Sequence, residues 1–383
     1  MNINSQNYQQ CTRCIMDTTD PRIFFNEQGE CNHCQNFDLV LSKKWFPNQI
    51  GEHKIDEIVS KIKENGRGKD YDCIIGLSGG LDSSYLAYKA SQFDLRILAV
   101  HVDAGWNSEL AVQNIENIVK KCGLDLFTHV VDWSDMRDLH YAFFKAQVPN
   151  QDIPQDHAFF AALYNFATKH SIEYVLHGSN IATESVLPKA WGYNAMDSRH
   201  IKAIHKLYGK SRLNDYPFVN FFQLNFYYPY IKRMKVAKLL NYMPYTVKAA
   251  IKELEEKVDY RYYGGKHFES RFTKFFQAHF LPHRFGYDKK MAHLSALILS
   301  HQLTREEALR EFKNPVYNST TLEEDRSYFI KKLGIDEEEY EQIMRGRTFE
   351  HDEYESNKWV FEKYNTIARD YKKFIPKWLR TTV

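Results

Sequence analysis

Ser78-Gly79-Gly80-Leu81-Asp82-Ser83-Ser84 forms a turn between an apolar run at 73–77 and a helical run at 85–90. This order of strand, glycine-rich turn and helix directs backbone N–H groups and the positive end of a helix dipole toward one point. The glycines let a ligand approach the backbone closely, and the serine hydroxyls add hydrogen-bond donors. We therefore expect the turn to bind a phosphate chain, unless it only caps the helix, with Asp82 in its first turn.

The segments after the turn alternate between helical patterns and apolar runs. Helical patterns lie at 82–93, 108–121 and 155–170, and apolar runs lie at 95–102, 125–131 and 173–176. The stretch just before 155 is expected to be irregular. Nearly continuous apolar strands separated by helices are typical of a parallel sheet that is covered on both faces. The sequence therefore predicts an α/β fold, with ligands bound beyond the carboxyl ends of the strands.

Polar clusters follow three of the predicted strands. One is the turn itself, the second is His101-Val102-Asp103, and the third is His177-Gly178-Ser179-Asn180. Because the carboxyl ends of parallel strands share one edge of the sheet, we expect the three clusters to form one site. Two alternatives stay open, namely Asp103 as an ordinary residue near a helix start and His177 as a structural histidine.

The segment 181–199 follows the third cluster and carries candidate substrate residues. Glu184, Lys189 and Trp191 combine polar groups for orientation with an aromatic face for a sugar or a base. An ordinary packed loop is the alternative.

A second glycine pair, Gly264-Gly265, precedes a basic helix start that contains Lys266 and Arg271. These cations are predicted to reach the β- and γ-phosphates, where charge develops on a departing pyrophosphate. The alternative is a solvated basic helix start.

Cys11, Cys14, Cys31 and Cys34 form two Cys-x-x-Cys pairs with sixteen residues between them. This spacing is typical of a zinc ribbon, and a closed site of four thiolates makes the Zn²⁺ structural because no coordination position stays open. Two disulfides, an iron–sulfur cluster, or His33 as a substitute ligand are the alternatives.

Composition limits the class of protein. The chain has 383 residues and a net charge of +2, which gives no general attraction to nucleic acid or anionic membranes. No apolar window is long enough to span a bilayer and no signal peptide is recognisable, so a cytoplasmic protein is expected. The aromatic segment 205–245 is expected to be a buried helix or an interface rather than a surface that stacks on bases.

Four domains are expected, with a zinc ribbon at 1–45, a linker helix at 46–70, the α/β domain at 71–235 and a helical domain at 236–383. Helical periodicity in the last of these recurs at 247–258, 269–280, 288–300, 304–312, 323–333 and 337–345.

The turn 78–84 lacks the lysine of the usual phosphate-binding loop and resembles the pyrophosphate loop of the ATP pyrophosphatase superfamily, whose fold is adenine nucleotide alpha hydrolase-like. Five motifs in one order then resemble the N-acetyl sugar amidotransferases of bacterial surface-polysaccharide and flagellin-glycan synthesis. These motifs lie at 11–21, 29–34, 78–84, 177–180 and 263–276, and the resemblance covers roughly residues 8–300.

The superfamily resemblance implies ATP and Mg²⁺ as cofactors and assigns roles to the polar clusters. Asp82 would hold Mg²⁺ or position the loop. The backbone of His101, Val102 and Asp103 would face adenine. The pyrophosphate would be held by Ser78, Gly79, Gly80, Ser83 and Ser84, and the ribose, α-phosphate or reacting carbonyl would lie near Gly178, Ser179 and Asn180.

The family resemblance implies that ATP adenylates the acetamido carbonyl of an N-acetyl sugar, expected to be linked to a nucleotide, and that ammonia then displaces AMP to leave an acetamidino group. Asp82, Lys266 and Arg271 would be catalytic. Glu184, Lys189 and Trp191 would select the sugar.

The source of ammonia is expected to lie outside this chain. A glutaminase needs a nucleophile such as a processed N-terminal cysteine or a Gly-x-Cys-x-Gly elbow, but position 2 is Asn2 and neither Cys73 nor Cys122 lies in an elbow. The family resemblance implies a separate glutaminase and a cyclase-like barrel subunit that conducts ammonia.

Two other functions fit parts of the sequence. A thiolase-like ligase that modifies tRNA also joins a pyrophosphate loop to a zinc ribbon, but it usually needs a reactive cysteine or cluster near the loop and a basic face. A catalytically silent scaffold for a glycan pathway is the other, and the intact turn 78–84 argues against it.

Overall fold

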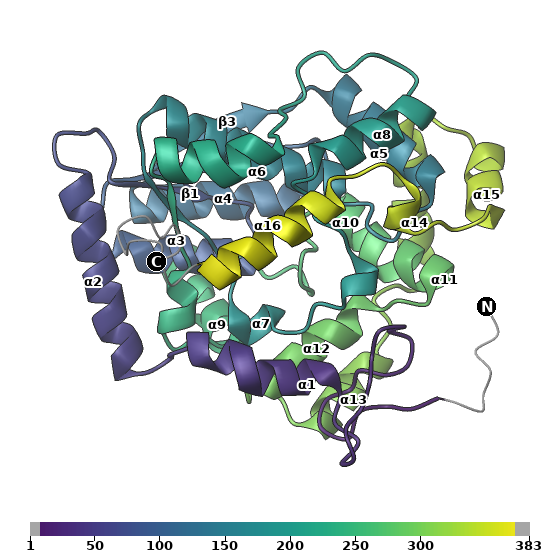
Figure 1. Cartoon of the computed structure of the whole chain (residues 1–383), viewed down its shortest axis with the longest axis horizontal. Helices are drawn as coiled ribbons and strands as arrows, with labels where there is room; N and C mark the ends of the chain where they lie inside the picture. The colour runs from purple at the N-terminus through teal and green to yellow at the C-terminus, as the bar shows by residue number, and fades with distance from the viewer. Residues whose placement is uncertain (1–7, 372–383) are drawn as a thin grey trace.

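The computed structural model describes residues 8–371, and its centre is a five-stranded parallel sheet (Figure 1). The strands are β1 Cys73–Gly76, β2 Ile97–Asp103, β3 Asp125–Val130, β4 Tyr174–Leu176 and β5 Lys235–Ala237. The α/β class and the four strands expected from the sequence are confirmed. The ends of the expected first and last domains, 1–7 with Asn2 and 372–383, lie outside the described residues.

The strand order, β3-β2-β1-β4-β5, reverses direction beside β1. Ile75 of β1 pairs with Ala99 of β2 on one side and with Leu176 of β4 on the other. In open α/β sheets the crevice beyond the carboxyl ends of two such strands binds ligands. Here β1 leads into the turn 78–84 and β4 leads into 177–180, so two of the three polar clusters meet at this point.

Side chains of the central strands alternate between two apolar cores. Ile74 and Val175 lie in one core, whereas Cys73 and Ile75 lie in the other, and all four are fully buried. Burial of an isoleucine side chain contributes about 2 kcal/mol, so the alternation fixes both faces of the sheet. The first core takes α5 Trp133–Ala146, α6 Ile153–Lys169 and α8 Ser198–Tyr208, and the second takes α2 Gln49–Asn65, α3 Leu81–Ser91, α4 Glu109–Cys122 and α9 Val247–Val258.

Two elements differ from the sequence-based expectation. The helix α5 occupies much of the stretch expected to be irregular, where Met136, Leu139 and Phe143 form its buried face. The strand β5 lies across the boundary expected between 235 and 236, so the sheet continues past it. A strand of three residues with one β-branched side chain has too little periodicity to be recognised in a sequence.

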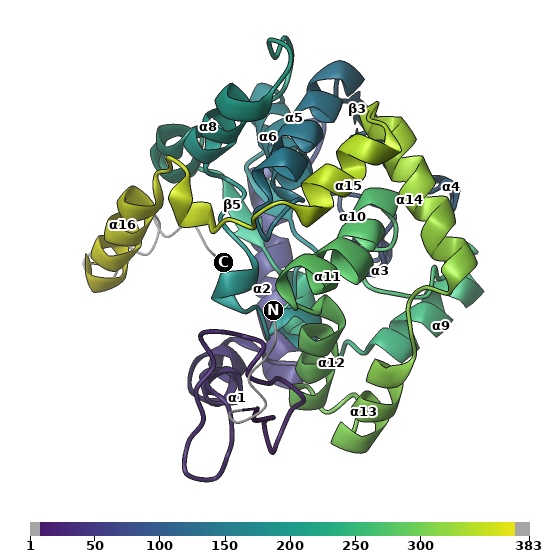
Figure 2. The same ribbon diagram turned by 90° about the vertical axis from the view of Figure 1, so that its right-hand side faces the viewer.

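The C-terminal part is helical, as expected (Figure 2). Its helices are α10 Arg271–Phe275, α11 Leu281–Phe285, α12 Lys289–Leu299, α13 Arg305–Lys313, α14 Ser319–Leu333, α15 Glu337–Arg345 and α16 Lys358–Tyr371. The sequence predicted neither α11 nor α16. Within residues 8–371, no helix is both long enough and apolar enough to cross a membrane.

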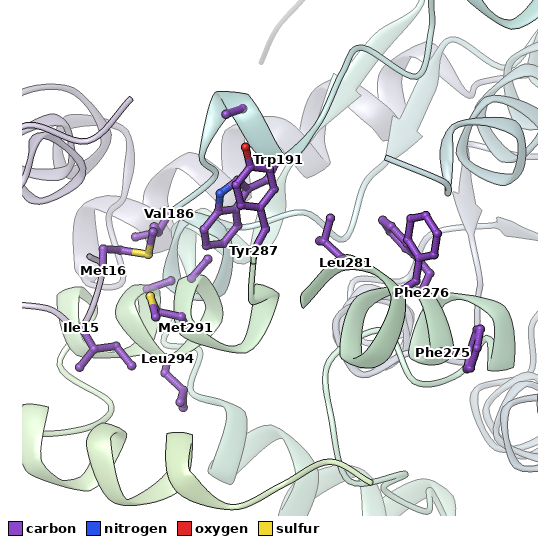
Figure 3. Close-up of a cluster of buried hydrophobic side chains, with 14 of the residues drawn as sticks. Ile15, Met16, Val186, Trp191, Phe275, Phe276, Leu281, Tyr287, Met291 and Leu294 are labelled. Carbon is purple, nitrogen blue, oxygen red and sulfur yellow. The ribbon is translucent and has the colours of Figure 1, made fainter. Parts of the chain in front are cut away.

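The cysteine-rich N-terminal segment rests on α12 and α13 (Figure 2). Arg305 donates hydrogen bonds to the carbonyls of Cys14 and Cys11, both at 3.0 Å, and the Ile15 N–H donates to Ser295 Oγ at 3.3 Å. Ile15 and Met16 lie beside the side chains of α12 (Figure 3). In this segment two isolated antiparallel bridges join Gln10 to Asp17 and Phe25 to Cys31.

The four cysteines fit a zinc site. Their sulfurs all lie within 4.8 Å of one another, and three of the separations are 3.6 to 3.7 Å. Zn–S bonds of about 2.3 Å in a tetrahedron require sulfurs about 3.8 Å apart. The cysteines are free thiols rather than disulfides, and His33 pairs with Asp20 at 2.8 Å instead of joining them. The cluster therefore fits a zinc site.

Replacing Cys14 with serine should remove the metal and destabilise the fold, because the cluster is buried in the same core as α12. We expect loss of bound zinc by elemental analysis and a decrease of at least about 2 kcal/mol in the free energy of unfolding, since structural zinc contributes directly to folding. The control Cys122→Ser lies outside the cluster and should keep its metal. Full zinc content in the Cys14 variant would contradict this assignment.

Candidate active site

The turn 78–84 has a backbone that only glycine can form at its second position. Gly79 has φ +80°, and a Cβ there would lie 2.5 Å from the carbonyl oxygen of Ala111. Ser78 Oγ accepts from the Gly80 N–H at 3.1 Å and lies 3.1 Å from Ser83 Oγ. The turn is thus closed by its own serines and held tightly against α4.

A cavity of 450 Å³ opens beside this turn, within the range of ligand pockets, which begins at about 300 Å³. It lies at the carboxyl ends of β1, β2 and β4, where the strand order reverses. Of the residues predicted for the site, those that line it are Ser78, Gly80, Asp82, Ser83, His101, Val102, Gly178, Ser179, Glu184 and Lys266.

An ion network links Asp82 to the distant glycine pair. Lys266 Nζ lies 2.6 Å from Asp82 Oδ2, 3.1 Å from Glu184 Oε1 and 2.9 Å from Thr183 Oγ1. Burial opposes the charge on Lys266, but the two carboxylates outweigh it and raise the pKa of Lys266. Burial likewise opposes ionisation of Asp82, and Lys266 nevertheless keeps its pKa below the ordinary value. The pair is therefore ionised at neutral pH.

The second oxygen of Asp82 is also occupied. Oδ1 accepts from Asn180 Nδ2 at 3.0 Å and from the Tyr245 hydroxyl. Asn180 is buried and does not line the cavity, so its place is to orient Asp82. The sequence offered no indication that Tyr245, one of many aromatic residues in the segment 205–245, would reach this carboxylate.

The histidines at the strand ends are held by local contacts. His101 Nδ1 lies 3.0 Å from the Leu77 carbonyl oxygen, and burial lowers its pKa. His177 Nδ1 accepts from the Ser179 N–H at 2.9 Å, its ring stacks on Phe160, and burial lowers its pKa to about 4. Both histidines are neutral at pH 7, and both line the cavity, so structural contacts do not remove them from the site.

Asp103 lies outside the cavity lining and serves the turn after β2. Its Oδ1 accepts from the Gly105 N–H at 2.8 Å and from Asn107 Nδ2 at 3.1 Å. Asn107 does line the cavity and also contacts His101 Nε2 at 3.1 Å. Gly79 and Ser84 do not line the cavity, and Ser84 Oγ is buried without a partner among the described residues.

Three predicted residues lie away from the cavity. Arg271 pairs with Asp325 at 2.6 Å and stacks over Tyr328, so its guanidinium is committed elsewhere. Lys189 is exposed and does not line the cavity. Trp191 is fully buried against Tyr287 in the core that holds the cysteine cluster (Figure 3). The segment 181–199 thus reaches the cavity only through its beginning.

Other residues line the cavity that the sequence did not identify. Asp152 and Asp156 enter from the start of α6, and Lys289 enters from the start of α12. The only sequence indication was a pair of acids four residues apart, which also occurs at ordinary helix starts. Burial raises the pKa of Asp152 to about 7 and that of Asp156 to about 6.

These shifts predict a pH-dependent stability that Asp152→Asn should remove. An aspartate with a raised folded-state pKa stabilises the protein below its unfolded pKa of about 4, and that stability is lost as pH rises through the folded pKa. Relative to wild type, the variant should gain on the order of 3 kcal/mol between pH 4 and pH 8. Asp156, His267 and Lys289 share this environment and broaden the transition.

Denaturant unfolding across that range measures the difference. The matched control is Asp215→Asn on the exposed surface, which should differ from wild type by a constant amount. A constant difference for the Asp152 variant as well would show that its pKa is unperturbed.

Comparisons with known proteins bear on the helical part. Residues 269–367 match the family model described as LPS biosynthesis protein WbpG-like, C-terminal domain. A search of curated proteins gave no match. Similar solved structures include NMN synthetase from Francisella tularensis, with 13% identity, 70% of this chain and 98% of that chain covered and a TM-score of 0.32. Another is the NH3-dependent NAD synthetase from Campylobacter jejuni, with 15% identity, 55% and 84% coverage and a TM-score of 0.29.

The matched region supplies part of the cavity wall, from Glu269, Ser270 and Thr273 to Lys289. Residues 269–367 thus resemble the C-terminal domain of the WbpG-like LPS biosynthesis proteins, in a chain that also has a parallel α/β sheet and a four-cysteine cluster.

Proposed function

We propose that the protein is an ATP-dependent amidotransferase of LPS biosynthesis. It would adenylate the acetamido carbonyl of a nucleotide-linked N-acetyl sugar and replace the carbonyl oxygen with ammonia. The observation that carries the proposal is the Lys266–Asp82 pair beside the turn 78–84, in a cavity whose other wall comes from the WbpG-like domain.

The proposed reaction has two steps, adenylation of the sugar and displacement of AMP by ammonia. The acetamido oxygen attacks the α-phosphorus of ATP, and the bond from that phosphorus to the pyrophosphate oxygen breaks. Ammonia then adds to the activated carbon, loses a proton, and expels AMP, which carries away the former carbonyl oxygen. An amide oxygen leaves poorly by itself, whereas AMP leaves readily, and holding substrate and α-phosphate in line supplies much of the rate.

Under this proposal the turn and Lys266 hold the leaving pyrophosphate. Charge develops there as the bond breaks, and the ammonium group of Lys266 would stabilise that charge once the bound phosphate has drawn it from Asp82. Mg²⁺ would supply further neutralisation of the phosphates. It would be held by Asp82 and Glu184, whose oxygens are now paired with Lys266.

Ammonia would come from separate subunits, a glutaminase and a cyclase-like barrel. Of the six cysteines, four form the metal cluster. Cys73 is fully buried in β1, where burial raises the pKa of its thiol, and Cys122 lies at the end of α4 with a raised pKa from the same cause. Neither has the thiolate character that a glutaminase nucleophile needs.

The direct test is incubation with ATP, Mg²⁺, ammonium and a panel of nucleotide-linked diacetamido sugars. We expect sugar-dependent release of pyrophosphate and AMP, and mass spectrometry should detect one oxygen replaced by NH. Glutamine in place of ammonium should give no product with the chain alone. Pyrophosphate release that depends on tRNA and not on any sugar would favour a tRNA-modifying ligase instead.

Lys266→Met should lower the rate of pyrophosphate release about 10²- to 10³-fold, as expected for loss of one donor to a developing charge. The control Lys331→Met changes an exposed lysine of α14 and should leave the rate unchanged. Thermal unfolding of both variants separates loss of chemistry from loss of fold. An unimpaired Lys266 variant that remains folded would remove this residue from the pyrophosphate site.

A further inference from the structure

The cavity wall contributed by α6 and α12 carries charges that the proposed phosphate chemistry does not use. Asp152 precedes the first residue of α6, Asp156 lies in its first turn, and Lys289 begins α12. All three line the cavity. Asp152 and Lys289 reach it from segments far apart in the sequence, so the fold brings opposite charges to one wall.

These charges face the cavity but do not pair. Among the ion pairs of the described residues none includes Lys289, Asp152 or Asp156. Asp152 is 5% exposed, yet one of its oxygens accepts only from Thr273 Oγ1, at 3.0 Å, and the other has no partner within residues 8–371. Asp156 and Lys289 are partly buried and have no ion-pair partner within residues 8–371. Charged groups enclosed in a cavity without partners are costly, so this wall is suited to hydrogen-bonding groups.

The mixture of signs selects the kind of ligand. A cation near the two carboxylates would be repelled by Lys289 and by His267, whose pKa the Glu269 carboxylate raises against the opposing effect of burial. An anion near Lys289 would be repelled by Asp156 and by the ionised fraction of Asp152, whose pKa of about 7 leaves it partly protonated at neutral pH. A neutral group that offers donors to carboxylates and acceptors to an ammonium satisfies all of them, and hydroxyl and amide groups do both.

We propose that Asp152, Asp156 and Lys289 bind the hydroxyl and acetamido groups of the acceptor sugar. This inference rests on the proposed function and gives its substrate subsite a place. Hydroxyls on a sugar ring could come from the acceptor sugar or from the ribose of ATP. We assign the acceptor because Lys289 and Thr273 belong to the WbpG-like region, whereas the turn and strand ends proposed for ATP belong to the sheet.

The assignment also replaces two sugar contacts expected from the sequence. Trp191 is buried in another core and Lys189 lies outside the cavity lining, so neither can touch a molecule bound there without a rearrangement. Glu184 remains at the cavity, but it is paired with Lys266 on the pyrophosphate side.

Calorimetric binding tests this without turnover. The probes are a UDP-linked diacetamido hexose and a non-hydrolysable ATP analogue, and the proteins are full-length wild type, Asp156→Asn, Lys289→Met and the surface control Lys331→Met. Asp156→Asn and Lys289→Met should each weaken binding of the sugar nucleotide about 10- to 100-fold, as expected for lost hydrogen bonds to charged groups. Affinity for the ATP analogue should change less than twofold.

The outcomes separate this inference from the proposed function. Weaker binding of the ATP analogue in the same variants would make the ribose the ligand, and unchanged sugar binding would place the subsite elsewhere. Either result overturns the inference. Sugar-dependent turnover by wild type would still uphold the proposed function. If wild type binds the sugar but never adenylates it, and the variants lose sugar binding, the subsite is supported and the proposed function is overturned. Failure of wild type to bind any sugar nucleotide overturns both. Lys289→Arg keeps a cation and should retain more affinity for the sugar nucleotide than Lys289→Met. It tests the role of the charge if Lys289→Met folds poorly.

Discussion

The contact between Lys266 and Asp82 joins parts of the chain 184 residues apart, and the geometry of the cavity depends on it. Asp82 stands in the first turn of α3, and its side chain is 18% exposed. A carboxylate so enclosed, with Glu184 beside the same ammonium, would take up a proton if Lys266 were absent. Asp82 therefore stays ionised only when the segment that carries Lys266 is in place. Gly264 and Gly265 let that segment bend toward Asp82.

The same contact couples the two charges of the proposed substrate complex. Lys266 cannot remain within 2.6 Å of Asp82 and also turn fully to a phosphate. When a phosphate draws the lysine away, Asp82 and Glu184 lose their counter-charge, and a divalent cation restores it. Nucleotide and cation should thus bind with positive cooperativity, because each removes an electrostatic cost imposed by the other.

Local sequence patterns predicted the parts of this protein whose causes are local. The turn 78–84, the strand ends and the cysteine spacing each encode their geometry within a few residues. By contrast, Asp152 and Asp156 look like any acidic helix start, and only the packing of α12 against the cavity gives them a common wall with Lys289. Trp191 is of a residue type common in sugar-binding sites, but it is buried in a core where it stacks on Tyr287. Tertiary contacts decided these positions, and a single sequence does not contain them.

The helix α12 links the four-cysteine cluster to this cavity. Its middle receives the cysteine-rich segment, through Ser295 and the core around Met291. Its first residue is Lys289, and Ser300, at its end, donates to the Ala182 carbonyl at 2.7 Å, one residue before Thr183, which binds Lys266. One helix therefore connects the metal cluster to both charged walls of the cavity. Because interiors are close-packed and transmit strain, a loosened cluster would displace both the ammonium of Lys289 and the segment that carries Thr183, whose hydroxyl accepts from Lys266.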